Sequence, residues 1–115
     1  MTVVVARDDL RERQFGYRLD FAISSRRNAA FGRWASEMLG YSGETSTLYA
    51  NKIVDLLNEP PRGSLTVDDN TVSQVLVDLI NAGAAIPPDE LRAILLEFEE
   101  QARRDTVTAP QDFDR

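Results

Sequence analysis

The segment from Arg26 to Gly40 constrains the fold most, because it combines helical periodicity with the only tryptophan of the chain. An α-helix turns by about 100° per residue, and an amphipathic helix that packs on a core needs one apolar sector. Gly40 suits the left-handed position at a helix end, and residues 41–43 read as a turn. The sequence therefore predicts a core helix that ends at Gly40. Its expected apolar stripe is Leu19, Ile23, Ala30, Trp34 and Met38.

Three further helices are predicted after this turn. The first spans about 42–58, and a loop that contains Pro60, Pro61 and Gly63 follows it in residues 59–65. The next begins in the polar run 68–71 and closes at Gly83, and the last spans about 86–104 with two prolines at its start. Their expected apolar stripes are Tyr49, Ile53, Leu56 and Leu57, then Val72, Val75, Leu76, Leu79 and Ile80, then Leu91, Ile94, Leu95, Phe98 and Ala102.

These four amphipathic helices predict an all-α fold, a four-helix bundle in one domain of 115 residues. We expect the bundle in residues 19–104, a flexible N-terminal arm in residues 1–18 and a disordered polar tail in residues 105–115. The arm contains Gly16, and an interior glycine costs a helix about 0.5–1 kcal/mol relative to alanine. A helix from Asp8 onward is therefore marginal without a partner.

Several classes of protein are excluded by what the composition lacks. The chain has no cysteine and no histidine, so neither a disulfide framework nor a zinc site built on these residues can form. We find no nucleophile system, Walker loop or glycine-rich phosphate cradle, and we expect no catalytic residue, metal or cofactor. The apolar residues 1–6 are too short for a signal peptide or a membrane span, which favours a cytoplasmic protein without membrane insertion. Nothing in the sequence sets an oligomeric state.

Charge is distributed unevenly along the chain. Residues 1–33 contain seven arginines and four acids, a net charge of +3, whereas the remainder contains six basic and fifteen acidic residues, a net charge of -9. This pattern favours a protein partner met through a basic, amphipathic arm. Nucleic acid is disfavoured, since phosphates would repel the acidic remainder. The alternative is a solvated helix face whose arginines pair internally.

An ordered set of residues runs through the middle of the chain: Arg26, Arg27, Asn28, Gly32, Trp34, Ala35, Glu37, Leu39, Gly40, Gly43, Tyr49, Ala50 and Val54, followed by Val72, Val75, Asp78, Leu79, Ala82, Gly83 and Ile86. This set resembles a known family, the alphaproteobacterial ATP synthase inhibitor zeta subunits, and the resemblance covers about residues 26–104. It implies a helical bundle whose flexible N-terminal segment inserts into the F1 catalytic head of the synthase and blocks ATP hydrolysis.

Carried onto this chain, the resemblance places the partner-binding residues in the arm. The expected contacts are Arg11, Glu12, Arg13, Phe15, Tyr17 and Arg18. The arm departs from the family pattern, in which a longer, acidic and alanine-containing arm is expected, because here it is arginine-rich and interrupted by Gly16. This departure leaves the fold expectation unchanged and concerns only the inhibitory segment.

A second hypothesis is a small-molecule-binding or regulatory helical module without ATPase inhibition. Its ligand would lie between the helices near Arg26, Trp34 and Tyr49. Arg26 falls at the edge of the apolar stripe, and a buried arginine requires either an anionic ligand or an internal carboxylate. Both partners for Arg26 stay open at this point.

Overall fold

The computed structural model describes residues 2–60, 63 and 66–107, and it describes the side chains of the first helix from Arg18 onward. Within these ranges the chain forms four α-helices and no strand: α1 (Thr2–Met38), α2 (Gly43–Asp55), α3 (Val67–Asn81) and α4 (Pro88–Val107). A short 3-10 turn, η1 (Leu56–Asn58), continues α2. The predicted all-α class with four helices is confirmed.

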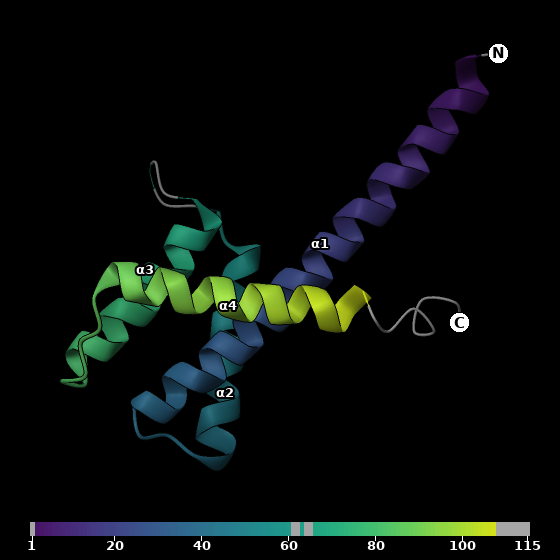
Figure 1. Ribbon diagram of the computed structural model, residues 1–115. Helices are drawn as coiled ribbons and strands as arrows, with labels where there is room; N and C mark the ends of the chain where they lie inside the picture. The colour runs from purple at the N-terminus through teal and green to yellow at the C-terminus, as the bar shows by residue number, and fades with distance from the viewer. Residues whose placement is uncertain (1, 61–62, 64–65, 108–115) are drawn as a thin grey trace.

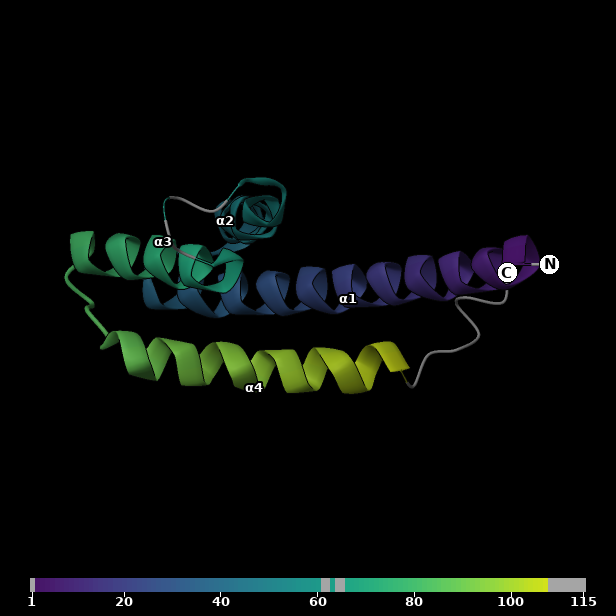
Figure 2. The ribbon, with the colours of Figure 1, turned by 90° about the horizontal axis from the view of Figure 1, so that it is seen from above.

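Helix α1 is the central element of the fold. Figure 2 shows α1 between α4 on one side and α2 with α3 on the other, and α4 runs in the opposite direction along α1. The core lies where the C-terminal half of α1 meets these three helices (Figure 1). The side chains that form it are Phe31, Ala35, Tyr49, Ile53, Leu56, Val72, Val75, Leu79, Leu91 and Leu95.

Two glycines end α1 and α3 as the sequence predicts. Gly40 has φ +83° and Gly83 has φ +76°, the left-handed conformation that glycine adopts without steric cost. After each glycine the next backbone N–H donates to a carbonyl five residues earlier, Tyr41 to Ser36 at 2.8 Å and Ala84 to Leu79 at 2.9 Å. This hydrogen-bond pattern is a Schellman motif, which reverses the chain within a few residues.

The start of α3 differs from its prediction. The N-cap is Thr66, whose hydroxyl accepts a hydrogen bond from the Asp69 backbone N–H at 3.0 Å, while the Asp69 carboxylate accepts one from the Thr66 N–H. This capping box begins the helix at Val67, before the polar run that was expected to cap it. Hydrogen bonding with Thr66, first through its side chain and then through its backbone N–H, lowers the pKa of Asp69 below its usual range.

The predicted buried face of α1 is wrong. Ile23 is buried, but Leu19, Ala30 and Trp34 are partly exposed and Met38 is 44 % exposed. The centre of the true buried face is rotated by about 125° around the helix from the centre of the predicted stripe. The prediction failed because three buried positions are polar and one is glycine. This face comprises Arg27, Asn28, Phe31, Gly32, Ala35 and Ser36.

The other predicted stripes agree better with the structure. Tyr49, Ile53 and Leu56 are buried on the second helical segment, and the predicted core positions of α4 are buried or partly buried. In α3 the prediction is wrong for Ile80, which is 53 % exposed. Helix α4 also continues three residues beyond the expected boundary and buries Thr106. The rest of the expected tail, residues 108–115, lies outside the described residues.

The N-terminal segment belongs to the same helix as the core. Helix α1 runs without a break through Gly16 and through the boundary expected between residues 18 and 19. In both views its N-terminal part projects away from the other helices (Figures 1 and 2). The division into a flexible arm and a body stays a prediction. No helix in the described part of the chain is both long and apolar enough to cross a membrane.

Candidate functional site

The projecting part of α1 is the candidate partner-binding element. The sequence-predicted contacts Arg11, Glu12, Arg13, Phe15 and Tyr17 lie on its helical backbone, and their side chains lie outside the described residues. Arg18 is described and exposed. Helix α4 ends at Val107 beside α1, and the N-terminal part of α1 continues past this point, beyond the body (Figure 2). The structure thus brings the predicted contacts onto one helix that leaves the core.

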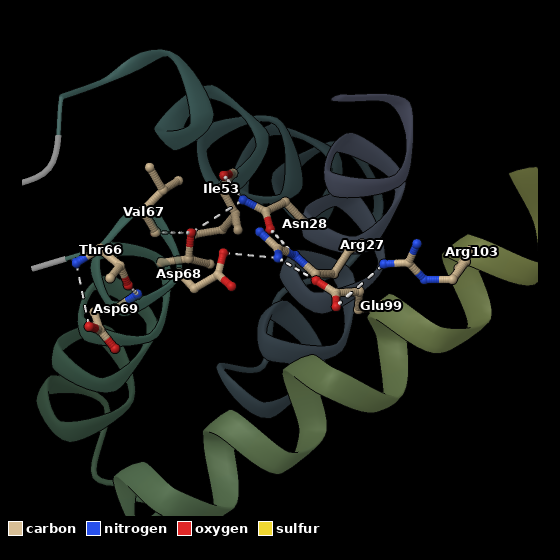
Figure 3. A network of polar contacts seen from close by, with 10 residues as sticks. Arg27, Asn28, Ile53, Thr66, Val67, Asp68, Asp69, Glu99 and Arg103 are labelled. Carbon is tan, nitrogen blue, oxygen red and sulfur yellow. Dashed lines mark hydrogen bonds and ion pairs between the residues drawn. The ribbon is translucent and has the colours of Figure 1, made fainter. Parts of the chain in front are cut away.

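A buried arginine anchors this helix in the body. Arg27 is only 2 % exposed, and its Nη1 donates to Asp68 Oδ1 of α3 at 3.0 Å and to Glu99 Oε1 of α4 at 2.9 Å (Figure 3). Its Nε donates to Asn28 Oδ1 at 2.9 Å, and Arg103 approaches the second Glu99 oxygen at 3.9 Å. Arg27 therefore ties α1 to both α3 and α4. Arg26, which was expected to be a buried arginine paired with a carboxylate or an anionic ligand, is exposed.

Asn28 extends the same network to α2. It is fully buried, and its side-chain N–H groups donate to the Ile53 carbonyl oxygen at 3.0 Å and to the Thr71 hydroxyl at 3.3 Å (Figure 3). The Thr71 hydroxyl in turn donates to the Val67 carbonyl at 3.2 Å. A buried amide that lost these partners would carry a desolvation penalty of about 1–3 kcal/mol. Asn28 and Arg27 together join all four helices at one level of α1.

Close contact between α1 and α2 depends on Gly32, one turn after Asn28. A Cβ atom at position 32 would lie 2.9 Å from the Ala50 Cα and 3.1 Å from the Ile53 Cβ. The first of these is a backbone atom, so the helices would have to separate to admit any side chain. Gly32 thereby sets the distance at which the Asn28 amide reaches the Ile53 carbonyl.

Tyr49 lies in a second polar group, on the α2 and α3 side of the body. Its hydroxyl donates to Asp78 Oδ2 at 2.8 Å, and the Lys52 ammonium lies 3.6 Å from the same oxygen and 5.6 Å from the Tyr49 ring centre. Burial, reinforced by the hydrogen bond to Asp78, raises the pKa of Tyr49 well above its ordinary value. An open surface hollow of about 370 Å³ lies beside this group, lined by Leu39, Tyr41, Tyr49, Lys52, Asp78, Asn81 and Ala82.

The structure separates the three residues of the proposed ligand site. Tyr49 lines the hollow, but Arg26 and Trp34 do not. Trp34 instead stacks on Phe31, with ring centres 5.7 Å apart and planes 14° apart. Across the described residues, no three acidic side chains gather in a way that could hold a metal ion. The polar groups around Arg27, Asn28 and Tyr49 bond across helices and so hold them in fixed positions. Among the described residues, the buried Asn70 amide nitrogen and Thr106 hydroxyl have no hydrogen-bond partner.

These features describe a small all-α protein in which one long helix forms part of the core and also projects from it. The family model described as ATPase inhibitor subunit zeta matches residues 1–105. Since this match covers nearly the whole chain, the protein belongs to the ATPase inhibitor subunit zeta family. The match confirms the resemblance seen in residues 26–104 and extends it to the N-terminal segment. Comparisons with curated proteins and with solved structures give no match.

Sequence reasoning missed Arg27 and Asn28 as buried polar residues that join the helices of the body. A signal was present, because Ile23, Arg27 and Phe31 follow one another at intervals of four residues, which places them on one face of a helix. An apolar stripe interrupted by arginine at its centre indicates a buried ion pair. The carboxylates that complete it come from α3 and α4, and no local pattern identifies them.

Proposed function

We propose that this chain binds the F1 head of an ATP synthase and inhibits ATP hydrolysis by inserting the N-terminal part of α1 into a catalytic interface. The observation that carries this proposal is the family match over residues 1–105, because it includes the N-terminal segment as well as the body. An inhibitor of this kind needs no catalytic residue. It needs a segment that fits a cleft in the partner and a body that prevents the segment from passing through.

The geometry of α1 supports this mechanism. Residues 2–18 of a continuous helix extend about 25 Å at 1.5 Å per residue, a length that reaches well into a protein cleft. The same helix is held in the body by the buried Arg27 and Asn28. A force on the inserted segment would therefore be transmitted through α1 to all four helices. The proposed contacts are Arg11, Glu12, Arg13, Phe15, Tyr17 and Arg18.

The test is the rate of ATP hydrolysis by purified F1 with the full chain and with a variant that lacks Met1–Gly16. We expect the full chain to lower the rate and the shortened variant to leave it unchanged. The deletion removes none of the buried core residues, so circular dichroism and the urea midpoint of the body serve as the control. If the shortened variant inhibits as well as the full chain does, insertion of this segment is not the mechanism.

The charge of the segment gives a second readout. Replacing Arg11, Arg13 and Arg18 together with glutamine should weaken inhibition and reduce its dependence on salt, since exposed charges steer association over about a Debye length of ~10 Å. A full chain that binds F1 without slowing hydrolysis would locate the failure in this arginine-rich segment with its central glycine. A full chain that neither binds nor inhibits would refute the proposed function.

A further inference from the structure

Three arginines on α1 differ from the other cations whose side chains are described. Lys52, Arg92, Arg103 and the buried Arg27 each form an ion pair, and Arg104 donates to Gln101. By contrast, Arg18, Arg26 and Arg33 are exposed, and within the described part of the chain their side chains have no hydrogen bond or ion pair. We call these three residues the arginine strip.

The arginine strip forms one continuous row. At about 100° per residue its members fall within a sector of about 80° on the side of α1 that faces away from the core, and they span about 22 Å along the helix. Ala22 and Ala29 lie between them, so no long side chain separates one arginine from the next. Phe21 lies beside Arg18 and is 53 % exposed. The row is therefore positively charged with one apolar side chain at its N-terminal end.

This row is unusual in a chain with a net charge of -6. Even Glu37, one turn after Arg33 and also exposed, makes no ion pair with it. Arginine presents a planar set of donors that matches carboxylates in a bidentate manner, and both arginine and aromatic residues are enriched at binding hot spots. A polyanion such as nucleic acid would also meet the repulsion of the acidic body, which a local acidic protein surface avoids.

We propose that the arginine strip with Phe21 is a docking surface for a carboxylate-bearing protein surface on the partner that receives the N-terminal part of α1. This inference rests on the proposed function. The strip continues along the same straight helix from the inserted segment, so the wall of a cleft that holds the segment lies beside the strip. Arg18 lies where the inserted segment ends and the strip begins. Arg26 and Arg33 then add affinity and orientation outside the cleft, whereas the segment inside the cleft blocks hydrolysis.

The experiment compares two double variants of the full chain with equal net charge. Arg26→Gln with Arg33→Gln removes two charges of the strip and leaves the proposed segment contacts intact. Lys52→Gln with Arg92→Gln removes two charges from α2 and α4 and is the control. The dissociation constant for purified F1 is measured by biolayer interferometry at low and at high ionic strength, together with the maximal inhibition at saturating protein.

We expect the strip variant to bind about 3- to 30-fold more weakly at low salt, as for two exposed ion pairs, and the control to change much less. The difference should shrink at high salt, and maximal inhibition should stay unchanged because the segment is intact. Equal binding by the wild-type chain and the strip variant at low salt would overturn this inference while the proposed function stands. Absence of any F1 binding by the wild-type chain would overturn both.

A second arm of the experiment tests other anionic partners. Duplex DNA and vesicles that contain phosphatidylserine are offered to the same variants. Binding that depends on Arg26 and Arg33 for either probe, with F1 binding unaffected, would overturn the assignment to a protein surface. Lack of strip-dependent binding to both probes, together with weaker F1 binding by the strip variant, supports it.

Discussion

Adjacent arginines in α1 allow a direct test of the buried network. Arg27 is 2 % exposed and donates at 2.9–3.0 Å to Asn28, Asp68 and Glu99, whereas Arg26 is exposed and has no side-chain partner in the described part of the chain. Arg27→Met and Arg26→Met each remove one positive charge from α1, at neighbouring positions. Any difference between them therefore reports the environment of the side chain.

The expected magnitude follows from the exposure of the partners. Removing one member of a fully buried ion pair costs about 3–5 kcal/mol, because the other charge is left without compensation. Here the side chains of Asp68 and Glu99 are 58 % and 28 % exposed, so water compensates them in part. We expect Arg27→Met to lower the free energy of unfolding by about 2–4 kcal/mol, and Arg26→Met to stay within about 0.5 kcal/mol of the wild type.

Urea denaturation followed by circular dichroism measures both variants, with an unchanged m value as the sign that the unfolded state is not altered. Arg27→Lys adds an intermediate point, since an ammonium cannot reproduce the fork that reaches Asn28 and the two acids together. Equal midpoints for the two methionine variants would refute the assignment of Arg27 as the anchor. A more stable Arg27→Met variant would mean that desolvation of the guanidinium outweighs its three hydrogen bonds.

Three further predictions concern other parts of the body. Gly32→Ala should destabilise the protein by about 1–3 kcal/mol in urea denaturation, because the new Cβ meets the α2 backbone at 2.9 Å; an unchanged midpoint would show that the helices separate freely. Phe31→Ala should cost about 3–5 kcal/mol and Trp34→Ala clearly less, since Phe31 is fully buried and Trp34 is partly exposed; iodide should quench Trp34 partially, and complete shielding would contradict its position. Because its pKa is raised, Tyr49 should stay protonated at about pH 10, where a solvent-exposed tyrosine ionises, so an ultraviolet titration should show one tyrosine that does not ionise until the protein unfolds. The free energy of unfolding should fall as the pH rises above about 10, because only the unfolded state releases this proton. Tyr49→Phe is the control and should abolish the component that ionises only on unfolding.

The elements of the fold were predictable where local signals decide them. Gly40 and Gly83 mark helix ends because few other residues adopt positive φ at low cost. The apolar stripes of α2 and α4 were identified because their buried residues are apolar. The capping box of α3 was also readable in principle, since Thr66 and Asp69 stand at the required spacing.

The buried face of α1 was not predictable by the same means. Arg27 is buried because Asp68 and Glu99, 41 and 72 residues away in the chain, meet it in space. The periodicity of apolar residues does not identify partners that are distant in the sequence. It also led to the prediction that Trp34, the largest apolar side chain of the segment, lies on the buried face. The predicted Arg26 site fails for the same reason, since the position one residue later points into the core.

The candidate site rests on the family resemblance, which predicted an N-terminal binding segment, and the family model matches the chain from residue 1 to residue 105. The partner contacts of this segment stay a prediction. Arg18, the one predicted contact whose side chain is described, is exposed. The arginine strip was not identified from the sequence. An unpaired arginine can be distinguished from a paired one only when the three-dimensional positions of the acidic side chains around it are known.

The unbroken course of α1 also limits how this protein can change during evolution. When two functional surfaces share one helix, each residue inserted between them turns one surface by about 100° relative to the other and moves it by about 1.5 Å. Three or four inserted residues nearly restore the angle, whereas one or two do not. Length variation between the projecting segment and Arg27 is thus expected to occur in whole helical turns, and a loop at this point would remove that restriction.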